Sequence, residues 1–524
     1  MNLIAKTFQG LEEVLAKELT ELGADNIQIG TRMVSFTGDQ ETLYRANFCL
    51  RTAVKVLKTI KQFTANDADE IYAVVKEMPW EELIDEKNTF LVESVVYSET
   101  FRHSKFVAYR VKDAVADRFM ERCGQRPNVS LSNPDLRINV HVAENDVTIS
   151  LDSSGESLHK RGYRTGTVAA PINEVLAAGL IKLSGWDGSC DLVDPFCGSG
   201  TIAIEAALIA LNIYPGVFRE EFAFERWRDF DEELLQRIYD DDSQEREFLH
   251  HIYGFDINRQ AVAIAQDNVR SAGVNKVVEI QQQDFYNFEW DQRAAIMITN
   301  PPYGERITTN DLLDLYATIG QRLKQQFVGN DAWIISSNEE CFIKIGFRPS
   351  TKYALYNGAI PCEFRRYQVF DGKLSERRSE GLDIKTDEER QRNAKFRSNR
   401  RSEDKGHSKP EFRPLFEGDE EPKLNRHNFK WGDRGSDYED AHDRHSHRTF
   451  ERGDRKERGD KKDFKGHGDH KDFKKGGNFK GHGDRKDFKK RSESKDGKDF
   501  KGKRRDEETT AQWGFDAEGR PFRK

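Results

Sequence analysis

The chain has 524 residues and a formal net charge of −8, which is the sum of two unlike parts: residues 1–373 carry 40 Lys and Arg against 56 Asp and Glu, whereas residues 374–524 carry 43 against 35. No apolar run approaches the ~18 residues of a membrane span, and the N-terminus is interrupted by charge, which argues against a membrane protein and a signal peptide. A soluble, cytosolic protein of two to four domains is therefore expected.

The first part of the chain predicts short strands and helices in alternation, because apolar residues recur at helical or strand spacing. In chain order we expect a strand at 2–8, a helix at 10–23, a strand at 27–38, a helix at 38–53, a strand at 55–63, a helix at 68–78, a strand at 89–98, a helix at 105–122 and a hairpin at 136–152. No cluster of acids, bases or nucleophiles emerges. This α+β region is therefore interpreted as a binding module.

A group of cations with one aromatic ring follows within residues 155–174. Phosphate contacts combined with stacking on a base or ribose use this mixture, so the segment is predicted to bind RNA; a solvated linker is the alternative. Pro171 is predicted to open the next helix, since proline is tolerated at the first helical position. The predicted RNA-binding residues are His159, Lys160, Arg161, Tyr163 and Arg164.

The following region alternates strands with helices, which indicates a mostly parallel, doubly wound sheet. Residues 213–250 form an insertion rich in aromatic and charged side chains. The expected strands lie at 190–196, 251–257, 277–283, 294–299 and 331–336, the helices at 201–212, 258–273 and 311–327, and a last antiparallel pair at 347–357 and 362–370.

From residue 374 onward this pattern is lost, and Gly, Lys, Asp, Arg and His dominate. Such a segment cannot bury enough apolar surface to offset its chain entropy, so it is predicted to be a disordered, basic tail. It contains a direct repeat at 464–475 and 479–490, with single phenylalanines among cations. This arrangement suggests stacking on unpaired bases; a solubilising tail without a ligand is the alternative.

A glycine-rich turn follows the first strand of the doubly wound region, in the sequence DPFCGSGT. Gly198 and Gly200 let the backbone approach a ligand, and a helix beginning near Thr201 presents free N–H groups there. The residues also satisfy the dinucleotide fingerprint G-x-G-x-x-A. However, Asp194 before the turn would repel a pyrophosphate, and the ribose-binding acid expected about 20 residues later is missing. A positively charged nucleoside, S-adenosylmethionine, therefore fits better than NAD.

Two further acids end the next strands. Asp256 is followed by the helix cap Asn258 and can accept hydrogen bonds from both ribose hydroxyls. Asp284, at the end of the third strand, is placed to receive the adenine amino group. Because the carboxyl ends of strands in such a sheet meet at one crevice, these acids and the glycine-rich turn predict one cofactor site.

The segment Asn300-Pro301-Pro302-Tyr303 stops an apolar strand abruptly. Two prolines make a stiff loop, in which the Asn300 side-chain oxygen and the Pro301 carbonyl can accept hydrogen bonds from an exocyclic amino group while Tyr303 stacks on the base. An ordinary Pro-Pro turn is the alternative. The six cysteines form neither a C-x-x-C pair nor a Cys/His cluster, so reduced thiols and no metal are expected.

Taken together, DPFC with GSGT, the sequence GFD, the third-strand Asp and NPPY resemble a class I S-adenosylmethionine-dependent methyltransferase of the amino-group type. The N-terminal region resembles the ferredoxin-like plus THUMP module of RNA-modifying enzymes, and LHKRGYR followed by API resembles their junction. Residues 1–370 are similar to the bacterial 23S rRNA guanine-N2 methyltransferase family, whose members act near the peptidyl transferase centre.

This resemblance implies an α/β fold: a doubly wound, seven-stranded methyltransferase domain, preceded by an α+β ferredoxin-like/THUMP module and followed by the tail. The implied domains are a ferredoxin-like unit at 1–45, a THUMP RNA-binding domain at 46–155, the methyltransferase domain at 156–373 and the tail at 374–524. The implied catalytic residues are Asn300, Pro301, Pro302 and Tyr303. The implied cofactor-binding residues are Asp194, Phe196, Gly198, Ser199, Gly200, Thr201, Asp256 and Asp284.

The implied reaction is methyl transfer to the exocyclic N2 of a guanine in 23S rRNA or a large-subunit precursor, without a membrane or metal partner. Methylation of tRNA guanine-N2 or of adenine-N6 is an alternative, since NPPY reads an amino group more than a whole base. An RNA-binding ribosome-assembly factor acting through the basic tail is an alternative of another class. Some relatives continue into a second methyltransferase domain, whereas here the basic tail follows, so a second modification is not implied.

Overall fold

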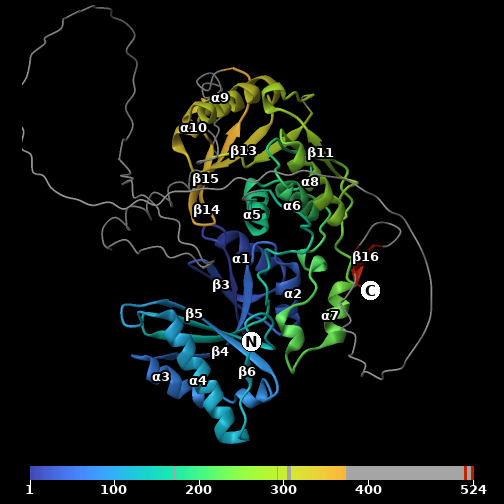
Figure 1. Ribbon diagram of the computed structural model, residues 1–524. Coiled ribbons are helices and arrows are strands. Elements are labelled where there is room, and N and C mark those ends of the chain that lie inside the picture. The colour runs from blue at the N-terminus through green and yellow to red at the C-terminus, as the bar shows by residue number, and fades with distance from the viewer. Residues whose placement is uncertain (169–170, 292, 304–308, 373–512, 516–520, 524) are drawn as a thin grey trace, which may run out of the picture. The chain divides into compact units, whose positions relative to one another are not determined.

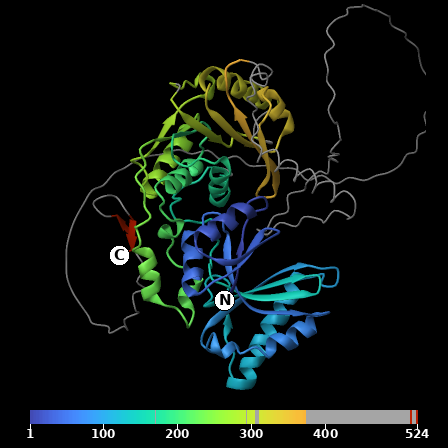
Figure 2. The ribbon, with the colours of Figure 1, turned by 180° about the vertical axis from the view of Figure 1, so that it is seen from behind.

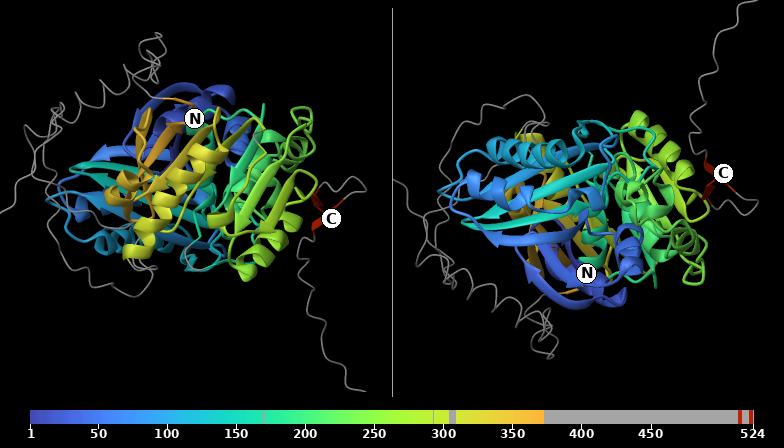
Figure 3. Two further views of the ribbon diagram at one scale, coloured as in Figure 1. Left: turned by 90° about the horizontal axis from the view of Figure 1, so that it is seen from above. Right: turned by 90° about the horizontal axis from the view of Figure 1, so that it is seen from below.

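The structure is a computed structural model, and it describes residues 1–168, 171–291, 293–303, 309–372, 513–515 and 521–523 (Figure 1). These residues form two large sheets with their helices, which Figure 2 shows from behind and Figure 3 from above and below. Among the described helices, none has the length and apolarity required to cross a bilayer.

The N-terminal part of the chain forms a single eight-stranded sheet, in the order β2-β3-β1-β4-β8-β7-β5-β6. Its strands are β1 (Asn2–Lys6), β2 (Asp25–Gly30), β3 (Met33–Thr37), β4 (Lys55–Thr64), β5 (Thr89–Tyr97), β6 (Asn128–Val129), β7 (Leu136–Ala143) and β8 (Asp146–Asp152). Its helices are α1 (Glu12–Glu21), α2 (Gln40–Cys49), α3 (Ala68–Lys76), η1 (Trp80–Glu82) and α4 (Ser104–Cys123). β1 pairs with β4, so the first two predicted units share one sheet, and α2 runs across residues 45 and 46, where the sequence placed their boundary.

Alternation along the strands explains why the helices pack on this sheet. Leu136, Ile138, Val140 and Val142 of β7 are buried, while the residues between them are only partly buried. A period of two places the buried set on one face of the sheet. These side chains join apolar residues of α1, α2, α3 and α4 in one core.

The second sheet has seven strands in the order β11-β10-β9-β12-β13-β15-β14, as the doubly wound prediction requires. Only β15 runs antiparallel to its neighbours β13 and β14; the other pairs are parallel. The strands are β9 (Asp191–Asp194), β10 (Ile252–Asp256), β11 (Val278–Gln282), β12 (Ala295–Thr299), β13 (Asp331–Ser336), β14 (Thr351–Asn357) and β15 (Ile360–Gln368). The helices are α5 (Glu174–Ser184), α6 (Thr201–Ala210), α8 (Arg259–Ser271), η4 (Phe285–Asn287), α9 (Thr309–Gln326) and α10 (Glu339–Ile345).

Helices cover both faces of this sheet. β9 and β12 are buried at every position, as expected for parallel strands packed on both sides. Leu192 of β9 belongs to a core shared with α5, α6 and α8, whereas the next residue, Val193, belongs to a core shared with η4, α9 and α10. Figure 1 shows α9 and α10 lying together beside β13.

The predicted insertion at 213–250 contains η2 (Pro215–Phe218), η3 (Ala223–Arg226) and α7 (Glu232–Tyr239). Most of its aromatic residues belong to the core of the eight-stranded sheet, where the Phe224 ring stacks on Tyr44 of α2 at 4.1 Å between centroids, whereas Phe218 belongs to the core of the seven-stranded sheet. The insertion therefore contributes apolar side chains to the cores of both the eight-stranded and the seven-stranded sheet.

Several local predictions were wrong. The strand expected at 27–38 is the β2–β3 hairpin, which turns at Arg32 with a φ of 59°. The helix expected to open at Pro171 begins at Glu174, because the Asn173 side chain caps it by accepting from the Val175 N–H at 2.9 Å. The predicted tail lies mostly outside the described residues, but it includes the antiparallel strands β16 (Trp513–Phe515) and β17 (Pro521–Arg523).

Candidate active site

Three predicted site residues meet at the carboxyl edge of the seven-stranded sheet. Asp194 ends β9, Asp256 ends β10, and Asn300 follows the last residue of β12. β9 lies between β10 and β12 and is parallel to both, so the ends of these strands are neighbours. The strand order also reverses at β9, which is where open α/β sheets bind their ligands.

The glycine-rich turn is held against the end of β10. Gly198 and Gly200 have φ values of 55° and 82°, which favour glycine, and Gly200 precedes the first turn of α6. The Gly198 N–H donates to Asp256 Oδ2 at 3.0 Å, and the Asn258 N–H donates to Asp256 Oδ1 at 2.8 Å. Each carboxylate oxygen keeps a further lone pair, so Asp256 supports the turn and can still accept from a ligand hydroxyl.

Asp194 is the most buried acid of the site, with 1% of its surface exposed. Its Oδ1 accepts from the Thr299 hydroxyl at 2.6 Å and from the Phe196 N–H at 3.2 Å. Burial, together with a smaller contribution from the nearby Asp256 carboxylate, raises the pKa of Asp194 from 3.8 to about 7. A cationic ligand beside Asp194 would favour the ionised form.

Phe196 and Asp284 lie on the cofactor side of the edge. The Phe196 ring packs against Phe285 of η4, with centroids 5.0 Å apart. Asp284 follows β11 by two residues and caps η4, because its Oδ1 accepts from the Tyr286 N–H at 3.0 Å. It is half-buried, and Oδ1 is the only oxygen of its carboxylate that accepts a hydrogen bond from the described residues. Both residues follow strands at the carboxyl edge of the sheet, and their contact with a cofactor stays a prediction.

The NPPY segment contains an unusual buried acceptor. Asn300 Oδ1 is buried and has no hydrogen-bond partner among the described residues. Pro301 is buried, and the Tyr303 hydroxyl accepts a hydrogen bond from the Asn357 side chain at 2.7 Å. A buried oxygen without a donor costs about 1–3 kcal/mol, unless a ligand supplies the donor.

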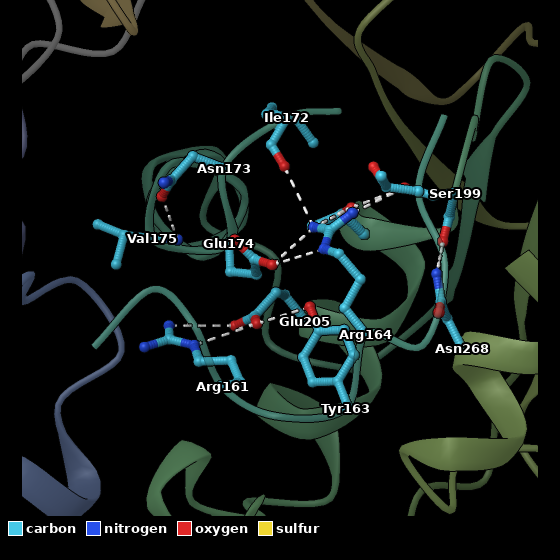
Figure 4. A network of polar contacts seen from close by, with 12 residues as sticks. Arg161, Tyr163, Arg164, Ile172, Asn173, Glu174, Val175, Ser199, Glu205 and Asn268 are labelled. Carbon is cyan, nitrogen blue, oxygen red and sulfur yellow. Dashed lines mark hydrogen bonds and ion pairs between the residues drawn. The ribbon is translucent and has the colours of Figure 1, made fainter. Parts of the chain in front are cut away.

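Ser199 and Thr201 do not face an open site. Arg164 donates to the Ser199 hydroxyl at 2.9 Å and to the Thr201 hydroxyl at 3.0 Å, and its guanidinium lies 2.7 Å from a Glu174 carboxylate oxygen (Figure 4). Arg164 was predicted to contact RNA. In the structure its partly buried side chain supports the glycine-rich turn, and its contact with RNA stays a prediction.

The RNA-binding prediction conflicts with the burial of Arg161 and Tyr163, which are each 2% exposed. Both side chains point to Glu205 of α6: Arg161 Nε lies 3.3 Å and the Tyr163 hydroxyl 3.0 Å from Glu205 Oε1 (Figure 4). Arg161 also donates to the Leu158 carbonyl at 2.8 Å. A buried charge requires such pairing, so these residues hold the fold together and cannot reach an RNA.

His159 and Lys160 stay nearer the surface. The His159 ring contacts the Ser157 hydroxyl at 2.8 Å, and burial together with the neighbouring cations lowers the pKa of His159 to about 4. His159 is therefore neutral near pH 7. Lys160 is exposed and pairs with Glu156 at 2.5 Å. An RNA contact by these two side chains stays a prediction.

Sequence reasoning missed three residues that shape the site. Glu205 is the buried partner of Arg161, and Asn357 holds Tyr303. Asn268 of α8, which is fully buried, accepts from the Thr165 N–H at 2.9 Å and donates to the Ser199 carbonyl at 3.0 Å. A polar residue on the apolar face of a helix is the only sequence signal for Asn268.

The acidic residues and the glycine-rich turn at the carboxyl edge of the sheet fit S-adenosylmethionine. Carboxylates with free acceptor positions suit ribose hydroxyls and an amino group, and the buried Asp194 suits a positive charge. The positive φ values of the turn bring backbone, rather than side chains, toward the ligand. Among the described residues, no group of three or more His, Cys, Asp or Glu could hold a metal ion.

Family models match three consecutive parts of the chain. The RlmL ferredoxin-like domain matches residues 2–57, the THUMP domain matches 65–152, and the RMKL-like methyltransferase domain matches 161–366. These matches account for the eight-stranded sheet and for the seven-stranded sheet that carries the site.

Similar sequences point the same way. A ribosomal RNA large subunit methyltransferase K/L of Syntrophotalea carbinolica is 38% identical over 387 residues, which are 71% of this chain and 54% of that protein. This chain thus spans about half the length of that relative, 54%. A protein of Synechocystis sp., named as a candidate RNA methyltransferase, is 36% identical over 70% of this chain and 96% of its own length.

Two solved structures have the same architecture. A methyltransferase candidate, SMU.472, complexed with SAH is 30% identical, with a TM-score of 0.65, over 71% of this chain and 99% of that chain. A methylase candidate from Clostridium difficile 630 is 33% identical, with a TM-score of 0.65, over the same shares of the two chains.

Proposed function

This chain belongs to the family of RMKL-like methyltransferases with THUMP and ferredoxin-like domains, and on that premise we propose that it methylates the exocyclic N2 of a guanine in 23S rRNA. We further propose that this guanine lies near the peptidyl transferase centre, that the substrate is the rRNA or a large-subunit precursor, and that the enzyme works in the cytoplasm. The K/L relatives are named for large-subunit rRNA, which supports the substrate class.

The observation that carries this proposal is the unpaired Oδ1 of Asn300. An acceptor buried beside the cofactor edge requires a donor, and an exocyclic amino group supplies N–H groups where a base carbonyl would not. Asn300 therefore selects an amine and fixes its orientation. Pro301 and Pro302 restrict the backbone directly after Asn300, so the acceptor is in place before the substrate arrives.

We propose S-adenosylmethionine as the methyl donor, which supplies an electrophilic methyl group when it is bound. The complex of SMU.472 with SAH and the acids of this site support the assignment. Asp256 would bind the ribose hydroxyls and Asp284 the adenine amino group. Asp194 would face the positive charge of S-adenosylmethionine. The remaining contacts with the cofactor would come from Phe196 and from the backbone of Gly198, Ser199, Gly200 and Thr201.

The protein contributes mainly by positioning. Asp194 ends β9 and Asn300 follows the adjacent β12, and the Thr299 hydroxyl joins the two strand ends. Acceptors held in this way orient the amine without a nucleophile or a covalent intermediate. Correct orientation of two reactants lowers a barrier by up to about 7–11 kcal/mol, which exceeds what one hydrogen bond contributes.

Adenine-N6 methylation is the second candidate. A structure titled as a predicted N6-adenine-specific DNA methylase from Listeria monocytogenes is 30% identical to this chain, with a TM-score of 0.65. Asn300 accepts from an adenine amino group as well as from a guanine amino group, so the site alone favours an amine. A tRNA guanine is a further alternative, as is an assembly factor acting through residues 374–524, which lie almost wholly outside the described part.

Methyl transfer from labelled S-adenosylmethionine to unmodified 23S rRNA, to precursor particles, to tRNA and to DNA tests this proposal. Mass spectrometry of nuclease fragments then identifies the base. We expect one N2-methylguanine in 23S rRNA. N6-methyladenine as the product would favour the second candidate, and binding without transfer to any substrate would favour the assembly factor.

A further inference from the structure

The β14–β15 hairpin forms the last two strands of the seven-stranded sheet, and its turn lies at the carboxyl edge that carries the candidate active site. β15 runs antiparallel to β13, with Glu363 paired to Ser336 at the end of β13. The start of β15 and the end of β14 therefore lie at the edge where the parallel strands finish. Asn357 and Ile360 flank the two-residue turn, in which Gly358 has a φ of 63°, as tight hairpin turns require.

One side chain of this hairpin contacts the NPPY segment. Asn357 Nδ2 donates to the Tyr303 hydroxyl at 2.7 Å, although 54 residues separate the two in sequence. Cys362 Sγ lies 3.8 Å from the same oxygen, and the Tyr303 ring packs against the core on the α5–α6 side of the sheet. The ring is thus held at its backbone end by the stiff Pro-Pro segment and at its hydroxyl end by the hairpin.

We propose that Asn357 is a positioning residue that fixes the Tyr303 ring for stacking on the target base, an inference that rests on the proposed function. Base stacking depends on the placement of a flat ring, and a hydrogen bond at the far end of that ring limits how far it can swing. Among the described residues, the side chain of Asn357 hydrogen-bonds to Tyr303 and to none of the predicted cofactor residues or Asn300. Its effect on methylation must therefore pass through Tyr303.

A contact that only stabilises the hairpin would behave differently. Loss of hairpin stability would lower the folded fraction and leave the turnover of the folded enzyme unchanged. Loss of ring placement would lower turnover at saturating substrate and leave the affinity for S-adenosylmethionine unchanged. A role in hairpin stability and a role in ring placement therefore predict different values of kcat, of cofactor affinity and of the coupling energy between Asn357 and Tyr303.

The test is a double-mutant cycle with Asn357→Ala, Tyr303→Phe and the double variant, all in the full chain. We expect each single substitution to lower kcat on 23S rRNA up to about 100-fold, with SAH affinity by calorimetry unchanged. Because both remove the same hydrogen bond, the double variant should be no slower than the slower single variant. Lys352→Ala, on the same hairpin, removes an exposed lysine that pairs with the partly exposed Glu363; it is the matched control and should keep full activity.

Additive losses in the cycle, or an Asn357→Ala variant with full kcat, would overturn the inference. Thermal unfolding of the same variants measures the Asn357–Tyr303 contact without any RNA. Additive shifts in Tm would overturn the inference as well. A wild-type enzyme that methylates no substrate would instead overturn the proposed function. Non-additive Tm shifts in that case would still establish the Asn357–Tyr303 contact, so the two failures are distinguishable.

Discussion

The Thr299 hydroxyl donates a hydrogen bond to Asp194 Oδ1 at 2.6 Å, and it thereby joins the last residue of β12 to the last residue of β9. Both side chains are buried. The bond connects the acid predicted to face the cofactor with the residue directly before Asn300. The cofactor side and the amine side of the site are therefore held in a fixed relation by a polar contact inside the sheet.

The stability of the protein should depend on pH through Asp194. Its pKa is raised by burial from 3.8 to about 7, so the folded state holds a proton that the unfolded state releases between these values. Stability from this group is complete below pH 4 and is lost as pH rises toward 7, by about 4 kcal/mol at most. Asp194→Asn, which keeps an acceptor for Thr299, should remove that loss.

Urea unfolding of both proteins between pH 5 and pH 8 measures this effect. The advantage of Asp194→Asn over the wild type should grow as pH rises. Parallel stability curves across that range would mean that Asp194 ionises in the folded state as readily as in the unfolded state.

Asp256→Ala should weaken binding of S-adenosylmethionine by about 1–3 kcal/mol, because it removes acceptors for the ribose and leaves the Gly198 and Asn258 N–H groups without their partner. Isothermal titration calorimetry measures the change. Asp267→Ala on α8 is the control, since Asp267 is 59% exposed and, within the described part of the chain, its carboxylate pairs only with Arg270, one turn further along the helix. Equal affinities in the two variants would contradict the assignment of Asp256.

Asn300→Ala should lower kcat on the RNA substrate by about 100-fold without lowering stability. The reason is that Asn300 Oδ1 has no partner within the described fold, so its removal breaks no recorded hydrogen bond of that oxygen. Asn338→Ala should do the reverse. Its side chain caps α10 by accepting from the Glu340 N–H at 2.9 Å, and such a cap contributes about 1 kcal/mol of stability.

Activity assays and thermal unfolding of the two asparagine variants test this contrast. An Asn300→Ala protein that turns over like the wild type would remove the main support for amine recognition. A large fall in its Tm would show that Asn300 serves the fold.

Glu205→Ala should destabilise the protein by about 3–5 kcal/mol, since it leaves the buried Arg161 guanidinium without its carboxylate. Glu156→Ala, at the exposed pair with Lys160, should change stability by less than about 1 kcal/mol. Denaturant unfolding compares them. Similar small effects would mean that Arg161 is solvated, which would reopen its predicted contact with RNA.

The position of the acids and the amide at the carboxyl edge of the sheet could be predicted from the sequence because it depends on local features. Apolar runs predicted the parallel strands, and Asp194, Asp256 and Asn300 directly follow or end those strands. The carboxyl ends of adjacent parallel strands share an edge in any sheet of this order, so a one-dimensional pattern was sufficient to place the three side chains together.

The partners of charged and polar side chains were decided only by the tertiary structure. The sequence suggests a surface cluster of Arg161, Tyr163 and Arg164. In the fold, however, Arg161 pairs with Glu205, which is 44 residues away, and Arg164 donates to Ser199, which is 35 residues away. The contact of Asn357 with Tyr303 and the packing of Phe224 on Tyr44 likewise join distant segments. Whether a cation is buried or exposed depends on which acid the fold brings to it, and sequence periodicity carries no information about that pairing.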